Sequence, residues 1–359
     1  MDNRYSADTI TIAGDSPDDI ERLNDIIDSA IHKRPLGRPV RTFGRRTVVP
    51  VRGHDPVEVS TVLRAAGAPG DPRPQLVFFS GTNQIRETPG GFADHHLFLI
   101  GNDVGHGLLY SPLPPDYEPP AKPDWKRPAG HLRRPVIALF DSGVREHEWL
   151  PDADPDDPFV LHPDDPALSR QWSSPVPEAP AGEPKAGHAT FNAGLIRMNA
   201  PSAQVLSIRV MDGEGMVDES NVVDALLWLE DYRRTRPVDV VLMPFGRSPD
   251  DEMDDDRTLD ELRAPIERLA GQGVAFVASA GNDHQSRGIH PALFDDVTAV
   301  GAGFGEYHAK FSNHGDWVDR YREGVNALSI LPGDGWGRWS GTSFSAAVLA
   351  ADLAHPHVA

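Results

Sequence analysis

The strongest constraint on the fold is a series of short apolar segments that alternates with helical segments along the second half of the chain. The apolar segments are rich in branched residues, which is typical of strands buried on both faces of a sheet. They are VIALF at 136–140, VLSIRVM at 205–211, VVLMPF at 240–245, VAFVASA at 274–280 and VTAVGA at 297–302. Helices are expected between them at 190–198, 219–235 and 256–270. This alternation predicts a parallel sheet with helices on both faces.

The first part of the chain has a more mixed pattern. Strands are expected at 8–14, 47–51, 75–80 and 96–101, and helices at 16–31 and 55–66. The helix at 16–31 has a serine cap, a proline in its first position and acidic residues in its first turn. The predicted fold class is therefore α/β, a three-layer doubly wound parallel sheet preceded by a smaller α/β domain.

A proline-rich segment separates the two patterns. Eight prolines fall within residues 111–135, and a segment with this composition is typical of an extended linker. The sequence thus predicts an N-terminal α/β domain at 1–110, a linker at 111–134 and the larger domain at 135–359.

Composition excludes several classes of function. The 359 residues carry a formal net charge of −20, which argues against binding to nucleic acid or to anionic membranes. The chain contains no cysteine, so disulfides, thiolate metal sites and a cysteine nucleophile are excluded. The start has neither a basic nor an apolar signal region, and no apolar segment is long enough to span a membrane. We expect a cytoplasmic protein, although a chain whose signal had been removed would look the same.

Four polar residues stand at the ends of predicted elements, where side chains can meet at the carboxyl edge of a parallel sheet. Asp141 and Asn282 each follow a buried strand, and His188 and Ser343 each begin a helix. Taken singly, each has an ordinary structural interpretation as a cap, a buried histidine or part of a turn. The glycine and alanines around Ser343, in WSGTSFSAAVLAA, equally suit a flexible turn before a tightly packed helix.

Together, the four residues suit nucleophilic catalysis. A serine hydroxyl is a weak nucleophile and needs an adjacent base, which His188 would supply near neutral pH. The histidine needs a carboxylate such as Asp141 to fix its tautomer and to stabilise the imidazolium. The developing oxyanion needs fixed donors, which the Asn282 side chain and the Ser343 backbone N–H at a helix start would provide.

The motifs around these residues resemble those of the subtilisin family of serine peptidases, whose triad has the order Asp, His, Ser. The resemblance rests on FDSGV, GHATFNAGLI, VASAGN and SGTSFSAA, which contain Asp141, His188, Asn282 and Ser343 respectively. VVLMPFG and AKFSNHGDWVD are similar to further segments of that family. The resemblance covers about residues 135–354, and four motifs in the right order make it specific.

The resemblance implies a serine endopeptidase that cleaves a protein or peptide substrate through an acyl-enzyme, and it implies no cofactor. Calcium is frequent in this family, but no loop of this sequence spaces its oxygen ligands as a recognisable cation site, so no metal is expected. The resemblance also implies substrate-binding positions after the predicted strands, which are Phe245, Gly246, Ser279, Ala280 and Gly281.

The sequence departs from the family pattern at three positions. Ala189 stands where glycine is usual, Pro244 replaces a common serine in the substrate strand, and Ala347 replaces the usual proline. Pro244 removes a backbone N–H where a substrate would pair. The chain also ends 16 residues after Ser343, short of the family's usual C-terminal elements. These departures leave open a catalytically silent peptide-binding module of the same fold, and the same triad would also suit an esterase or a transpeptidase.

Residues 1–110 allow two interpretations. Members of the family often carry an N-terminal propeptide that assists folding and is then removed. This region is larger than a propeptide requires and is followed by a long proline-rich tether. We therefore expect it to stay attached and to act as a regulatory or partner-binding domain.

Overall fold

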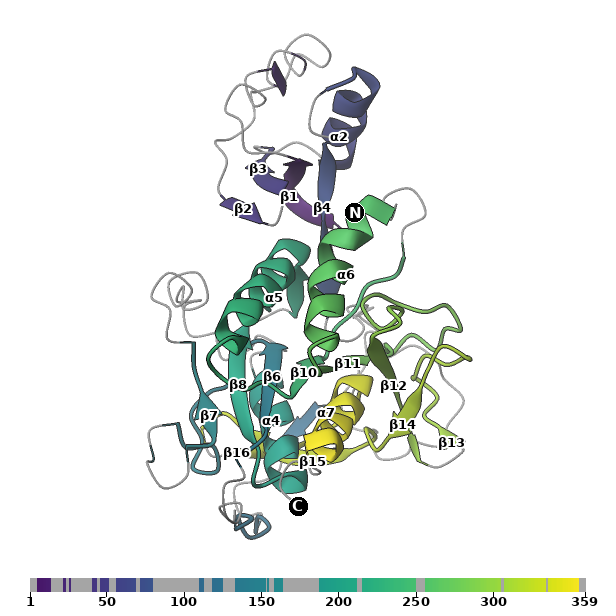
Figure 1. Cartoon of the computed structure of the whole chain (residues 1–359). Coiled ribbons are helices and arrows are strands. Elements are labelled where there is room, and N and C mark those ends of the chain that lie inside the picture. Colours follow the sequence, from purple (N-terminus) through teal and green to yellow (C-terminus); the bar gives the residue numbers. More distant parts are fainter. Residues whose placement is uncertain are drawn as a thin grey trace. The chain divides into compact units, whose positions relative to one another are not determined.

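The arrangement of helices and strands is that of a computed structural model (Figure 1). The residues that it describes are 5–13, 22–23, 26, 41–43, 46–51, 56–68, 72–79, 110–112, 118–124, 133–152, 154, 158–163, 187–211, 215–249, 256–304, 307–333 and 335–354. Among them, no helix is both long and apolar enough to cross a bilayer.

The chain divides into two compact units. One contains Met1–Phe78, Val217–Tyr232 and Asp250–Ile266, and the other contains Phe79–Met216, Arg233–Pro249 and Glu267–Ala359. The domain boundaries at 110 and 134 stay a prediction from the sequence.

The first unit is built on a five-stranded sheet with the order β2-β3-β1-β4-β9. The strands are β1 (Tyr5–Ala13), β2 (Arg41–Phe43), β3 (Arg46–Pro50), β4 (Arg73–Phe79) and β9 (Met216–Asp218). Helix α2 (Pro56–Ala65) contacts β1, and apolar side chains from these elements, among them Ile10, Val49 and Leu63, form a buried core. The strands expected at 8–14, 47–51 and 75–80 and the helix at 55–66 are confirmed. The strand expected at 96–101 and most of the helix at 16–31 lie outside the described residues.

The second unit contains the parallel sheet that the sequence predicts. Its order is β13-β12-β11-β10-β6-β8-β7, with β14 paired to β12. The strands are β6 (Val136–Asp141), β7 (Val160–Leu161), β8 (Gln204–Arg209), β10 (Val240–Met243), β11 (Ala275–Ser279), β12 (Val297–Phe304), β13 (Tyr307–His308) and β14 (Arg320–Arg322). All neighbours are parallel except β12 and β13. The four central strands, β6, β8, β10 and β11, are almost entirely buried, as their apolar sequences predict.

Two helices of this unit pack against each other and against the sheet (Figure 1). They are α4 (His188–Asn199) and α7 (Thr342–Ala354), and α7 also contacts β10, β11 and β12. The alanines of α7 are buried, which shows that the small residues after Ser343 serve close packing of this helix. The other two predicted helices, α5 (Glu219–Arg233) and α6 (Asp256–Ala270), belong mostly to the first unit.

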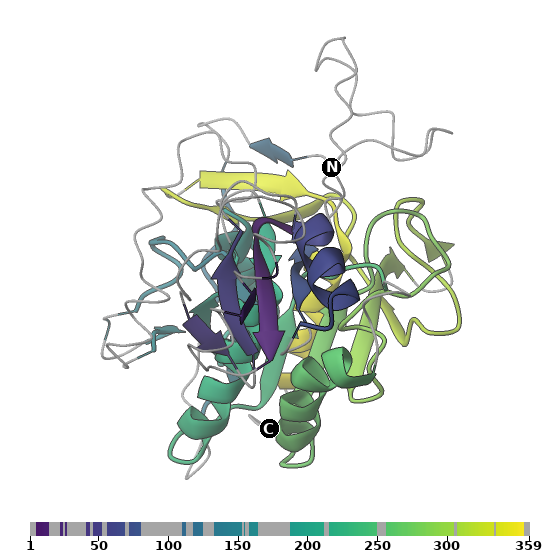
Figure 2. The same cartoon turned by 90° about the horizontal axis from the view of Figure 1, so that it is seen from above.

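A second, antiparallel sheet belongs to the same unit. It has the order β15-β16-β5, with β15 (Ala327–Leu331), β16 (Gly335–Trp339) and β5 (Tyr110–Pro112) (Figure 2). In β5, Tyr110 lies opposite Trp339 and Pro112 lies opposite Gly337. This sheet is not expected from the sequence, and β5 overlaps the start of the predicted linker. A strand of three residues that ends in proline has too little pattern to be recognised.

Helix α4 lies directly on β15 because it carries glycine at the point of contact. A Cβ atom at Gly194 would overlap with Ser329 Oγ and Ile330 Cγ1. The Ser329 hydroxyl in turn donates a 2.8 Å hydrogen bond to the Phe191 carbonyl of the helix. This contact fixes the position of α4 and therefore the position of His188 at its start.

We predict that Gly194→Ala lowers the free energy of unfolding by about 1–3 kcal/mol, because the added methyl group must displace β15. Alanine is the better helix former by about 1 kcal/mol, so helix propensity alone predicts the opposite sign. Urea denaturation of the two proteins measures the difference. A stabilised variant would contradict the close packing of α4 on β15.

Candidate active site

Asp141 and His188 form a buried pair. Asp141 is the last residue of β6, and His188 is the first residue of α4. The His188 Nδ1 atom lies 2.9 Å from both Asp141 Oδ1 and Oδ2. Both residues are almost completely excluded from solvent. Facing a carboxylate, Nδ1 carries the proton, so Nε2 is left as the basic atom of the ring.

Ser142 makes hydrogen bonds both to the end of β6 and to the start of α4. Its backbone N–H donates a 2.6 Å hydrogen bond to Asp141 Oδ1. Its hydroxyl oxygen accepts a 3.2 Å hydrogen bond from the N–H of Ala189, in the first turn of α4. The first N–H groups of a helix lack partners inside the helix, so Ser142 satisfies one of them and holds His188 beside the carboxylate.

Ser343 lies in the first turn of α7 and is buried. Its hydroxyl donates a 3.1 Å hydrogen bond to the carbonyl of Pro244, which follows β10. Within the described part of the chain, no hydrogen bond joins Ser343 to His188. The next residue, Phe344, packs against the His188 ring at a centroid distance of 5.6 Å. The start of α7 therefore lies next to the histidine.

Asn282 is oriented by Thr342. The backbone N–H and the hydroxyl of Thr342 donate hydrogen bonds of 2.9 and 3.0 Å to Asn282 Oδ1. The Thr342 hydroxyl oxygen also accepts a 3.1 Å bond from the N–H of Gly281. Because the amide oxygen faces Thr342, the Nδ2 donor is the end of the side chain that remains available. It lies beside the helix start that carries Ser343, whose own N–H has no acceptor inside the helix.

The five predicted substrate-binding residues follow, or end, two neighbouring strands. Phe245 and Gly246 come after β10, and Ser279, Ala280 and Gly281 lie at and after the end of β11. The side chains of Phe245, Ser279 and Ala280 are buried, so only their backbone could meet a substrate. Substrate contact by these five residues stays a prediction.

Asn313 uses part of that backbone. Its Nδ2 donates to the Ala280 carbonyl at 2.8 Å, and its backbone N–H donates to the Gly281 carbonyl at 2.9 Å. Gly281 has a φ of 96°, a conformation that favours glycine, and a Cβ atom there would overlap with Asn313 Nδ2. Asn313 thus fixes the backbone immediately before Asn282.

An aromatic cluster surrounds the His188 ring. Trp339 of β16 packs edge-on against it at 5.7 Å, and both Trp339 and Phe344 also contact Phe191. These rings keep water from one side of the imidazole and hold its plane. Sequence reasoning missed Trp339, because only the tertiary fold brings β16 to the start of α4.

Two further residues of the site were missed. Asn192 donates a 2.9 Å hydrogen bond to Asp141 Oδ2, and Thr342 orients Asn282. Asn192 could have been found from its place four residues after His188, since residues at this spacing share one face of a helix. Thr342 stood within the recognised motif but received no role.

The electrostatics around Asn282 involve Asp283. Desolvation raises the pKa of the Asp283 carboxyl above its usual range.

Across the described residues, no three acidic or histidine side chains gather as a metal ion would require.

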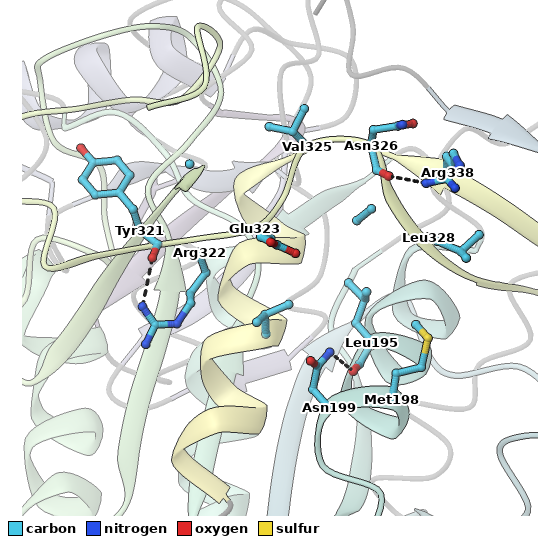
Figure 3. A pocket seen from close by; sticks show the side chains of 13 residues that line it. Leu195, Met198, Asn199, Tyr321, Arg322, Glu323, Val325, Asn326, Leu328 and Arg338 are labelled. Atoms are coloured by element: carbon cyan, nitrogen blue, oxygen red, sulfur yellow. Dashed lines mark hydrogen bonds between the residues drawn. The ribbon is translucent and has the colours of Figure 1, made fainter. Parts of the chain in front are cut away.

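A separate pocket of about 650 Å³ lies at the far end of α4 (Figure 3). Leu195 and Met198 of that helix form part of its wall, together with Leu328 of β15 and residues around Glu323. None of the four predicted catalytic residues lines it, so it is distinct from the Asp141–His188 centre.

The chain is similar to proteins of one known family. The model of the subtilase family matches residues 133–356, which is more than half of the chain. A thermophilic serine proteinase from Bacillus sp. (strain AK1) is 31% identical over 47% of this chain and 37% of its own length. The major intracellular serine protease of Bacillus subtilis (strain 168) is 29% identical over 47% of this chain and 54% of its own length.

Subtilisin BL from Lederbergia lenta is 30% identical over 65% of this chain and 78% of its own length. The matched region spans about half or less of the first two relatives. Among solved structures, the protease domain of PatA is similar with a TM-score of 0.48 and 20% identity, over 63% of this chain and 80% of that one.

We predict that Thr342→Val destabilises the protein by about 1–3 kcal/mol, because the buried Asn282 Oδ1 loses a donor and the partly buried N–H of Gly281 loses its acceptor. Thr342→Ser is the matched control, since it keeps the hydroxyl and should retain most of the stability. Thermal unfolding of the three proteins measures the effect. Equal losses in the valine and serine variants would show that the hydrogen bonds of Thr342 are unimportant.

Proposed function

Because this chain belongs to the subtilase family, we propose that it is a serine endopeptidase that hydrolyses peptide bonds through an acyl-enzyme. The observation that carries this proposal is the buried hydrogen bond between His188 and Asp141, with Ser343 at the adjacent start of α7. The same arrangement leaves the Nε2 base of His188 for a nucleophile. The named relatives are serine proteases, which supports the same reaction class.

In the proposed reaction, the Ser343 hydroxyl oxygen attacks the carbonyl carbon of the scissile peptide while His188 Nε2 takes its proton. Asp141 stabilises the resulting imidazolium through Nδ1. His188 then gives this proton to the leaving amine as the C–N bond breaks. A water molecule, deprotonated by His188, hydrolyses the ester that remains on Ser343.

The oxyanion that forms during attack requires donors already fixed in place. Asn282 Nδ2 is suited to this role because its amide oxygen is held by two hydrogen bonds from Thr342. The backbone N–H of Ser343 is the second donor, and the positive end of the α7 dipole reinforces both.

The Ser343 hydroxyl must change partner before it reacts. In the structure it donates to the Pro244 carbonyl. We propose that a rotation about the Cα–Cβ bond turns it toward His188, which lies beside the next residue of the helix. Catalytic hydrogen bonds are often long or misaligned without substrate and tighten in the complex. A substrate backbone lying along residues 244–246 would compete with the Ser343 hydroxyl for the Pro244 carbonyl and would thereby favour this rotation.

The second candidate is a catalytically silent peptide-binding module. The hydrogen bond from Ser343 to Pro244 and the nearly complete burial of His188 are the observations that favour it. Such a module would bind peptides equally well with serine or alanine at position 343 and would cleave none of them.

We also propose that residues 1–110 stay attached in the active protein. Strand β5 supports this proposal, because Tyr110 and Ser111 pair with β16, the strand that carries Trp339 beside His188. Cleavage between about residues 120 and 135, which a removable propeptide would require, would take this strand away from the peptidase unit. A regulatory or partner-binding role for residues 1–110 and a cytoplasmic location stay predictions from the sequence.

We predict that Ser343→Ala abolishes hydrolysis of a quenched fluorescent peptide library, with a loss of at least about 1,000-fold, while thermal stability is unchanged. Ser345→Ala is the matched control. Its hydroxyl is buried on the same helix and has no hydrogen-bond partner among the described residues, so its loss should leave the rate intact. Activity near the wild-type level in Ser343→Ala would contradict the assignment of the nucleophile.

We predict that the purified, active protein keeps its full length. Intact-mass spectrometry of a sample that has just hydrolysed a peptide substrate checks this directly. A mature form that begins between about residues 120 and 135 would show instead that the N-terminal region is a removable propeptide.

A further inference from the structure

The carboxylate of Asp141 has a third donor besides His188 and Ser142. Asn192 lies one helical turn after His188 on α4 and is completely buried. Its Nδ2 atom donates a 2.9 Å hydrogen bond to Asp141 Oδ2 and lies 3.4 Å from His188 Nδ1. The amide group therefore touches both members of the Asp–His pair.

We propose that Asn192 is a positioning residue, which holds the Asp141 carboxylate and limits the negative charge that it presents to His188. This inference rests on the proposed peptidase function. Asn192 acts through Asp141 and touches neither the nucleophile nor the oxyanion donors.

The hydrogen bonds of the carboxylate show what Asn192 adds. Oδ1 accepts from the Ser142 backbone and from His188, whereas Oδ2 accepts from His188 and from Asn192. Each oxygen thus has one donor other than the imidazole. With both oxygens held, the carboxylate plane cannot rotate away from Nδ1, and the imidazole keeps the orientation that exposes Nε2.

The other end of the Asn192 amide indicates that its donor is the functional group. Asn192 Oδ1 is buried and has no hydrogen-bond partner among the described residues. A buried acceptor without a partner costs stability, so a leucine of similar size would pack there at lower cost. Packing therefore does not explain why residue 192 is an asparagine. The hydrogen bond from its Nδ2 atom to Asp141 does explain it.

The direction of the effect follows from the charges around the ring. Asp141 on β6 is the charged group that contacts His188 in the described part of the chain. Its other ring contacts are Trp339 of β16 and Phe344 of α7, which carry no charge. The positive end of the Asn192 amide neutralises part of the Asp141 charge and also faces Nδ1. Asn192 thus opposes formation of the imidazolium, and its removal favours a protonated His188 at higher pH.

The test compares Asn192→Leu and the smaller Asn192→Ala with the wild type in two measurements. NMR titration of the His188 imidazole follows its protonation without any need for activity, and kcat/KM for a peptide substrate is measured from pH 5 to 9. We expect the midpoint of both curves to move upward by about one pH unit. We also expect kcat/KM on the plateau to fall about 10- to 100-fold.

Asn199→Leu is the matched control. Asn199 is an exposed residue near the end of the same helix, where its Nδ2 donates a 2.8 Å hydrogen bond to the Leu195 carbonyl (Figure 3). Loss of this amide should leave both midpoints unchanged. Thermal unfolding of each variant shows whether the protein is folded, and so separates an effect on the Asp141–His188 pair from a loss of folded protein. If Asn192→Leu does not fold, the same two measurements are made on Asn192→Ala.

Unchanged titration midpoints in a folded Asn192 variant would overturn the proposal, whatever the change in kcat/KM. Loss of a purely structural residue lowers the amount of active protein but does not move the midpoints. A wild-type protein that hydrolyses no peptide would instead overturn the proposed function. In that case the NMR titration still decides whether Asn192 acts on the Asp141–His188 pair.

Discussion

The structure of the site depends on the hydrogen bond between a fully buried carboxylate and a buried imidazole. A carboxylate taken out of water is costly unless donors surround it, and Asp141 has donors from the chain that follows it, from His188 and from Asn192. Two of these three belong to α4. The charge at the end of β6 can therefore be tolerated only if α4 begins where it does, so the Asp141–His188 pair and the local fold require each other.

The remaining parts of the second unit bring the other reacting groups to that pair. The alanines of α7 and the glycine at position 194 of α4 allow these helices to pack closely against the sheet and the β15–β16 hairpin. As a result, Ser343 and His188 stand at neighbouring helix starts, next to the ends of parallel strands. The helix start that carries Ser343 also orients Asn282 through Thr342. One structural feature thus places both the proposed nucleophile and a proposed oxyanion donor.

The parallel sheet could be predicted from the sequence because its signals are local, and the four candidate catalytic residues could be named for the same reason. Apolar runs mark the strands, and Asp141, His188, Asn282 and Ser343 stand at ends of elements within short motifs. Strand β5 and the position of Trp339 could not be predicted, because Trp339 meets Tyr110 and His188 only in the fold, and each lies more than 150 residues from it along the chain. Asn192 could have been predicted, since its spacing from His188 places both residues on one face of α4. The orientation of the Ser343 hydroxyl toward Pro244 is a rotamer choice that no sequence pattern encodes.

We propose that Asp141, His188 and Ser343 form one acyl-transfer centre. Labelling with a fluorophosphonate, followed by peptide mass spectrometry to locate the adduct, tests it most directly, because the reagent requires an activated serine and no knowledge of the natural substrate. We predict a single adduct at Ser343 that is lost when His188 is changed to alanine. No adduct in a folded wild-type protein, or labelling that persists without His188, would contradict the account.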